Sequence, residues 1–154
     1  MSTESAEESC RRFLETDSTP AAKAYFCLCA GQEMERQQNY QAAIACYSLA
    51  FGLTPGTDDV WYLLHNNLGF CLNHFEKYEE AEPYCRQAIE MYPARHNAYK
   101  SLGISLQGQA QYLAAAEQFL KAVLICSKDP RALSDLKLLR QQHPDIPPLN
   151  RGKV

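Results

Sequence analysis

Apolar and small residues follow a helical spacing along most of the chain, with two such patterns in each of three successive segments. A short polar turn separates the two patterns, and the second pattern has small residues seven apart, such as Ala81 and Ala88. Pro55 and Pro93 follow the second pattern in two of the segments and predict where its helix stops. The chain is therefore predicted to be all-α.

The paired patterns are internal repeats. A shift of 34 residues places Gly69 on Gly103, and a shift of 38 places Gly31 on Gly69. The four extra residues lie around Gly56 and are close to one helical turn, so they should lengthen the start of one helix without changing its face. The same two shifts relate three further sets of residues: Tyr40, Tyr78 and Tyr112; Ala43, Ala81 and Ala115; Ala50, Ala88 and Ala122.

Each copy reads as two helices, and a helical hairpin of this size cannot bury its own apolar face, so the hairpins are expected to stack. The glycine of each copy should let two helices cross closely, with Ala43, Ala81 or Ala115 opposite it. A larger residue at either place should cost about 1–3 kcal/mol through overpacking.

The glycine, tyrosine, alanines and proline at these offsets resemble the tetratricopeptide repeat, within residues 21–129. The resemblance implies an α-solenoid of three hairpins, at about residues 24–57, 62–95 and 96–129. In the second copy, Asn66-Asn67-Leu68-Gly69 and the segment 78–83 look most like the repeats of kinesin light chains.

The resemblance also implies that the first helix of each hairpin lines a concave groove that binds a peptide segment of a partner protein. Asn and Gln side chains in this groove offer both donors and acceptors for an extended backbone. For Asn66, Asn73 and Asn97 the alternative is plain solvated surface. The candidate groove residues are Tyr25, Leu28, Gln32, Leu63, Asn66, Asn67, Phe70, Asn73, His74, Asn97, Lys100, Ser101 and Ile104, with Cys29, Glu35, Arg36, Gln107 and Gly108 at equivalent positions.

Members of this family that act as heat-shock co-chaperones resemble one another in a clamp of basic and amide residues. The clamp places Lys and Asn where this chain has Leu28 and Gln32, and basic residues where it has Asn97 and Ser101. Only Asn67 matches, so this role is not favoured.

The two ends are predicted to be helical. Residues 1–20 carry a capping-box pattern at Ser5 and Glu8, and the short helix that follows could cap the first hairpin or lie in the groove. An apolar stripe of Ala132, Leu133, Leu136 and Leu139 predicts a capping helix over residues 130–142, and residues 143–154 read as an extended tail.

Composition narrows the function. The formal net charge of −3 argues against a nucleic-acid partner. The sequence contains no run of 18 apolar residues, so membrane insertion is not expected. The first residues also lack the pattern of a secretory signal. The odd number of cysteines, seven, and their irregular spacing favour reduced thiols in a cytoplasmic protein.

Catalytic and metal-binding patterns are not apparent in the sequence. Cys71 and His74 could share a helical face, but a zinc site needs four ligands, and no second pair has suitable spacing. We therefore expect no enzyme, cofactor or metal. The leading hypothesis is a monomeric protein-interaction adaptor or scaffold, and the alternative is a secretion-type or other dedicated chaperone for a protein client.

Overall fold

The computed structural model describes residues 4–148 and contains helices but no strand within that range. The predicted all-α class is therefore confirmed. Residues 149–154 of the predicted tail lie outside the described part of the chain. The helices are α1 (Ala6–Leu14), α2 (Pro20–Arg36), α3 (Tyr40–Ala50), α4 (Asp59–His74), α5 (Tyr78–Met91), α6 (His96–Gly108), α7 (Tyr112–Ile125) and α8 (Pro130–Gln142).

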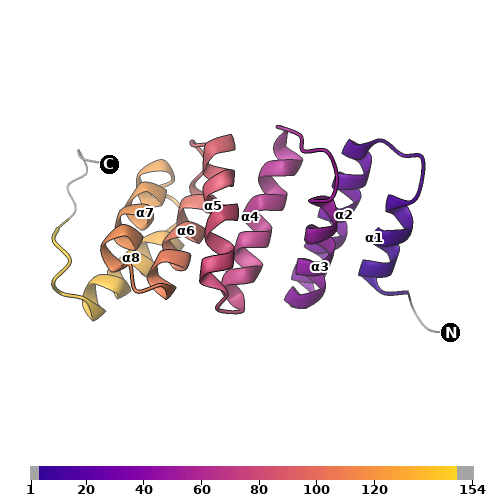
Figure 1. Ribbon diagram of the computed structural model, residues 1–154. Coiled ribbons are helices and arrows are strands. Elements are labelled where there is room, and N and C mark those ends of the chain that lie inside the picture. The colour runs from indigo at the N-terminus through magenta and orange to yellow at the C-terminus, as the bar shows by residue number, and fades with distance from the viewer. Residues whose placement is uncertain (1–3, 149–154) are drawn as a thin grey trace.

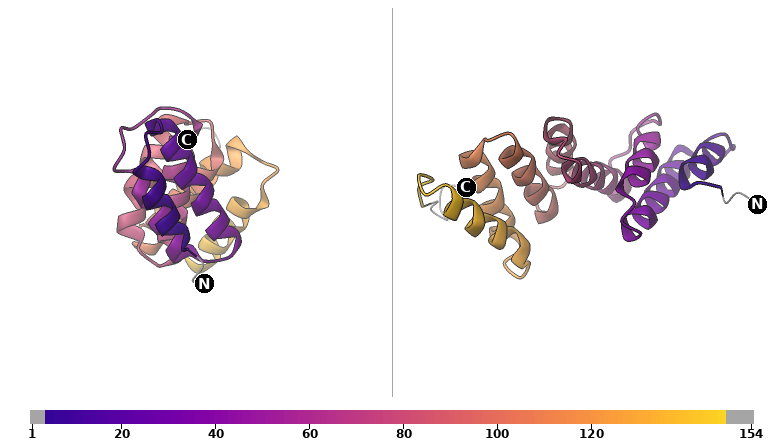
Figure 2. Two further views of the ribbon diagram at one scale, coloured as in Figure 1. Left: turned by 90° about the vertical axis from the view of Figure 1, so that its right-hand side faces the viewer. Right: turned by 90° about the horizontal axis from the view of Figure 1, so that it is seen from below.

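The helices form an elongated stack in which α2–α3, α4–α5 and α6–α7 are successive hairpins (Figure 1). Each hairpin packs mainly on its neighbours in sequence, and α1 and α8 lie at opposite ends of the stack. The view along the stack shows its compact cross-section, and the view from below shows the same extended shape (Figure 2). This arrangement confirms the predicted α-solenoid.

The turn inside each hairpin has one geometry, which repeats along the chain. Gln38, Glu76 and Ala110 have φ of 59°, 57° and 60°, in the left-handed region. The following residue donates to the carbonyl five positions earlier, as in Asn39 N–H to Met34 O at 2.9 Å. Two more such bonds run from Lys77 to Leu72 and from Gln111 to Leu106, so all three first helices end in the same Schellman-type turn.

Several helices begin at a residue whose side chain caps the first turn. Ser5 and Glu8 form the predicted capping box, with Ser5 N–H donating to Glu8 Oε2 at 2.9 Å and Glu8 N–H donating to Ser5 Oγ at 3.2 Å. Asp58 caps α4 by accepting from the backbone N–H of Trp61 at 3.3 Å. These bonds satisfy backbone donors that the first helical turn leaves free.

The glycine of each hairpin does mark a close helix crossing, but the residue opposite it differs from the prediction. Ala43, Ala81 and Ala115 are fully buried, yet the side chain that blocks a larger residue comes four positions later on the same helix. A Cβ added to Gly31 would lie 2.2 Å from a Tyr47 ring carbon, one on Gly69 2.6 Å from Cys85 Sγ, and one on Gly103 2.5 Å from a Phe119 ring carbon.

The buried residues form two main clusters. The first core cluster runs from Cys10 to Ala81, and the second runs from Cys85 to Ile146, so the division falls within α5. At the start of the chain, Cys10 is fully buried and the Phe13 ring stacks on Phe26 with centroids 4.4 Å apart. Helix α1 therefore caps the first hairpin and does not occupy the groove.

Helix α8 covers the other end of the solenoid through Leu136 and Leu139, which lie in the second core cluster. Ile146 joins the same cluster at 5% exposure, and the His143 ring stacks on Tyr112 with centroids 3.6 Å apart. The described beginning of the predicted tail is thus held against the solenoid.

Candidate functional site

Two adjoining hollows lie along the face formed by the first helices of the hairpins. One has a volume of about 480 Å³ and is lined by residues of α2 and α4, and the other has about 210 Å³ and continues across α4 and α6 to α8. Both include Glu35 and Asn67, so we treat them as one surface and call it the groove. Its lining is Gln32, Glu35, Arg36, Asn66, Asn67, Phe70, Asn97, Lys100, Ser101 and Arg131.

Most of the groove lining is made of residues that the sequence suggested. The repeat register brings seven of the main candidates together from three helices: Gln32, Asn66, Asn67, Phe70, Asn97, Lys100 and Ser101. Their side chains are mainly amides, with Phe70 as the large apolar contact.

Ser101 and Asn66 line the groove at only 6% and 9% exposure, and two other suggested residues are buried and do not line it at all. Leu28 is only 2% exposed and belongs to the first core cluster. Asn73 is 7% exposed, and its Nδ2 donates to Ser101 O at 2.9 Å while its Oδ1 accepts from Ser105 Oγ at 2.8 Å. Leu28 therefore packs in the core and Asn73 ties α4 to α6, so neither side chain is available to a peptide.

The remaining candidates lie outside the lining of the two hollows. Tyr25 is 59% exposed on α2, and the exposed His74 ring stacks against Tyr40 with centroids 4.0 Å apart. Leu63 and Ile104 are partly buried against the core. These four residues flank the groove without lining it.

A chain of hydrogen bonds links three helices beside the groove. The Tyr47 hydroxyl on α3 donates to Glu35 on α2, and Asn67 Nδ2 on α4 reaches the Tyr47 oxygen at 3.4 Å. Burial raises the pKa of the Glu35 carboxyl, and burial followed by the nearby carboxylate raises the pKa of Tyr47. The orientation of the Asn67 side chain is therefore fixed by its hydrogen bond to Tyr47, and through Tyr47 by Glu35.

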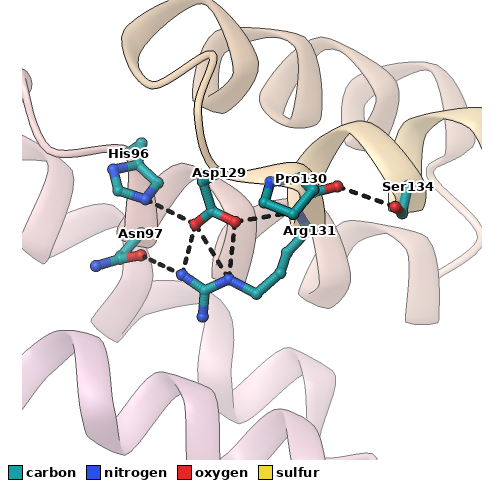
Figure 3. A network of polar contacts seen from close by, with 6 residues as sticks. All are labelled: His96, Asn97, Asp129, Pro130, Arg131 and Ser134. Carbon is teal, nitrogen blue, oxygen red and sulfur yellow. Dashed lines mark hydrogen bonds and ion pairs between the residues drawn. The ribbon is translucent and has the colours of Figure 1, made fainter.

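Arg131 on α8 is the groove residue that sequence reasoning missed. Its Nε lies 2.9 and 3.0 Å from the Asp129 oxygens, and its Nη2 reaches Asn97 Oδ1 at 3.4 Å (Figure 3). His96 Nε2 lies 2.9 Å from Asp129 Oδ2, so Asp129 orients Arg131 and joins α6 to α8. These hydrogen bonds, chiefly those from Arg131, hold the pKa of Asp129 well below its usual value.

The repeat register could have identified Arg131. It stands 34 residues after Asn97, the spacing that relates the second and third copies, so α8 presents it in the same direction as the groove residues of α6. Treating residues 130–142 only as a cap hid this equivalence.

Charged residues lie at both ends of the groove. Lys100 and Arg131 lie near its α8 end, whereas Glu35 and Arg36, of opposite charge, both lie on its α2 side. Asn66 is 9% exposed and its Oδ1 has no hydrogen-bond partner within residues 4–148. Amides between these charged ends suit the alternating donors and acceptors of a peptide backbone.

The described residues give no evidence of a metal-binding site or of a membrane-spanning helix. Between residues 4 and 148, no group of three or more His, Cys, Asp or Glu side chains is arranged to hold a metal ion. In the same part of the chain, every helix is too short or too polar to cross a bilayer.

The sequence matches a family model over part of its length. Residues 62–95 match the tetratricopeptide repeat, which is also the range expected for the second copy. A curated relative, protein O-mannosyl-transferase Tmtc2 from Drosophila melanogaster, is 31% identical over 81 residues, or 53% of this chain. The matched region spans only 9% of that relative's length.

Solved structures share the fold. The second TPR domain of human RPAP3, in complex with the HSP70 peptide SGPTIEEVD, has a TM-score of 0.70 at 24% identity, covering 79% of this chain and 98% of that domain. The Arabidopsis OM64 TPR domain has a TM-score of 0.72 at 19% identity, covering 80% and 98%. The first TPR of Spaghetti (RPAP3), bound to the HSP90 peptide SRMEEVD, has a TM-score of 0.68 at 19% identity, covering 77% and 91%.

The predicted resemblance to the tetratricopeptide repeat is thereby confirmed for residues 62–95 and for the fold. Identities this low establish architecture only, so the ligand of this groove has to be argued from its own residues.

Proposed function

We propose that this protein is an interaction module that binds a segment of a partner protein in the groove. The observation that carries the proposal is the continuity of the lining: Glu35 and Asn67 belong to both hollows, so one ligand segment can follow the surface from α2 to α8. Phe70 supplies apolar contact, and positioned amides on both sides of it can bind the ligand backbone. One such bond contributes about 0.5–1.5 kcal/mol net, so several must act together to reach micromolar affinity.

We infer that three repeats build the groove, at about residues 24–57, 62–95 and 96–129. The identical left-handed turns at Gln38, Glu76 and Ala110 support this division, because their spacings of 38 and 34 equal the shifts in the sequence. The likeness of the second copy to kinesin light chains stays a prediction.

A heat-shock tail is not the ligand we propose, although two of the structural neighbours were solved with such peptides. The family clamp needs a basic residue where this chain has Leu28, which is buried, and two more where it has Asn97 and Ser101. Lys100 and Arg131 do place positive charge at one end of the groove, but at other positions.

A dedicated chaperone remains the second prediction from the sequence, and oligomeric state separates it from an adaptor. We expect the adaptor to be a monomer, and light scattering of the full chain and of a chain lacking residues 1–19 measures this. A dimer that depends on residues 1–19 would favour the chaperone.

The groove itself is tested with Asn67→Ala/Asn97→Ala. The tagged wild-type protein and the tagged variant are each used to capture partner proteins from native cells. The captured proteins are then quantified by mass spectrometry. We expect specific partners to fall at least tenfold with the double variant. The matched control Gln41→Ala/Gln118→Ala removes two amides from the second helices α3 and α7 and should leave capture unchanged. Equal capture by both variants, at equal melting temperature, would contradict the proposal.

A further inference from the structure

A second hollow lies on the opposite side of α4 from the groove. Its volume is about 620 Å³, and it opens between α3 and α5, which flank α4 (Figure 1). We call it the α3–α5 hollow. Helix α4 turns Asn67 and Phe70 toward the groove and His65, Leu68 and Leu72 toward this hollow, as expected for opposite helical faces. Its lining is Ile44, Ser48, His65, Leu68, Leu72, Lys77, Glu80, Pro83, Tyr84 and Gln87.

Apolar and polar side chains line the hollow in nearly equal number, and among them His65 supplies an acceptor whose tautomer is fixed. His65 Nδ1 lies 2.7 Å from the carbonyl oxygen of Trp61, and a carbonyl can only accept, so Nδ1 carries the proton. Burial lowers the pKa of His65, which keeps the ring neutral near pH 7. Nε2 is then an acceptor, and residues 4–148 offer it no hydrogen-bond partner.

The surroundings of His65 fit a flat aromatic ligand. The Phe51 ring meets His65 edge to face with centroids 4.9 Å apart, and Tyr84 lies 6.2 Å from it, so the imidazole is fixed. Lys77 and Glu80 form an exposed ion pair at the rim, with N and O 3.5 Å apart. The Lys77 ammonium group can make a cation–π contact with the face of an aromatic ligand. Among aromatic side chains, the indole of tryptophan forms the strongest contact of this kind.

The equivalent place at the next hairpin is already occupied by charge. The 38-residue shift relates Ile44 to Glu82 and Ser48 to Arg86. Arg86 Nε donates to Glu82 Oε1 at 2.7 Å, and Gln109 Nε2 donates to Glu82 Oε2 at 2.7 Å. The α3–α5 hollow therefore owes its apolar wall and free volume to Ile44 and Ser48.

We propose that the α3–α5 hollow is a binding site for a tryptophan side chain inserted by a partner protein, with the indole N–H donating to His65 Nε2. The bicyclic ring lies against Ile44, Leu68 and Tyr84, and Lys77 approaches its face. The volume is within the usual range for small-ligand sites, about 300–1,000 Å³. This site is separate from the groove, so it does not depend on the function proposed above.

The test uses indole and benzofuran, which have the same shape but differ in the N–H donor. Each is titrated into the ¹⁵N-labelled full chain and followed by NMR, and Trp61, the single tryptophan of the sequence, reports from beside His65. We expect saturable shifts around His65, Ser48 and Gln87, with benzofuran binding about three- to tenfold more weakly, the effect of one hydrogen bond. N-acetyltryptophanamide, which carries the ligand on a peptide backbone, should give the same shifts.

The variant Ile44→Glu/Ser48→Arg transfers the second hairpin's ion pair into the hollow and should abolish the indole shifts. Ser48 is exposed and Ile44 is partly buried, so the chain should still fold, which the remaining spectrum shows directly. The control Arg86→Ser changes the equivalent position one hairpin later and should leave indole binding unchanged. Shifts in the groove instead of the hollow, or equal affinity for indole and benzofuran, would overturn the proposal. Binding of indole but not of N-acetyltryptophanamide would also overturn it, because the site would then take a free small molecule.

Discussion

The junction between the first and second hairpins is filled by aromatic rings, whereas the junction between the second and third is tied by buried hydrogen bonds. At the first, Phe51 meets Trp61 and Tyr84 edge to face, with centroids 5.9 and 5.3 Å apart. At the second, Asn73 on α4 bonds to Ser101 and Ser105 on α6. These contacts lie at different places in the repeat, because the 38-residue shift relates Asn73 to Glu35, which bonds to Tyr47, and Phe51 to Ile89.

The difference has a geometric consequence. The aromatic junction borders the 620 Å³ hollow beside His65, whose free volume comes from Ile44 and Ser48. At the second junction a Cβ on Gly108 would lie 2.2 Å from a Tyr78 ring carbon, Glu82 bonds to Gln109 across the helices, and the hollow that Tyr78, Gly108 and Gln109 help to line is smaller, about 360 Å³. A repeat protein can therefore keep its period while its junctions differ in the room that they leave.

The largest effect should come from removing the central ring of the first junction. Trp61 is 3% exposed, so Trp61→Ala should lower the free energy of unfolding by about 3–5 kcal/mol through lost burial and an unfilled cavity. Arg95 holds the same register 34 residues later and lies 4.5 and 4.4 Å over the Tyr62 and Tyr92 rings. Arg95→Ala should cost only about 1 kcal/mol. Urea denaturation measures both, and equal losses would contradict the asymmetry.

An intermediate effect is expected from the buried polar contact of the second junction. Asn73→Ala removes both bonds that its side chain makes to α6 and should cost about 1–3 kcal/mol. A double-mutant cycle with Ser105→Ala sharpens this, because the double variant should cost less than the sum of the single variants. Strict additivity in the denaturation data would show that the two side chains do not act as a unit.

The smallest effect should be a pH dependence confined to the first junction. Burial lowers the pKa of His65 below its ordinary value of 6.5, so the unfolded chain binds the proton more readily than the folded chain. The stability linked to His65 is therefore complete above pH 6.5 and is lost as the pH falls through that value toward the lower folded pKa. His65→Asn should flatten this part of the stability profile measured by denaturation between pH 5 and 8. Tyr99 holds this register in the second junction. An unchanged slope in the variant would rule out His65 as the cause.

The repeat period, the hairpins and the end helices could all be predicted, because each depends on local spacing, capping and turn residues. The degree to which each individual side chain is buried could not be predicted from the sequence. The 38-residue shift relates Leu28 to Asn66, but Leu28 packs in the core at 2% exposure while Asn66, at 9%, lines the groove. The same non-local packing decided that Tyr47, Cys85 and Phe119, rather than the conspicuous alanines, meet the glycines.

Helix α5 contributes Ala81 to the first core cluster and Cys85 to the second. Stability in stacked repeats is approximately a sum of local terms and nearest-neighbour terms, so each cluster can open while the other persists. Hydrogen exchange should then resolve two cooperative units, one from α1 to the start of α5 and one from the rest of α5 to α8. The helical turn of α5 between Ala81 and Cys85 would then set how far local unfolding that begins at either end of the solenoid spreads along the molecule.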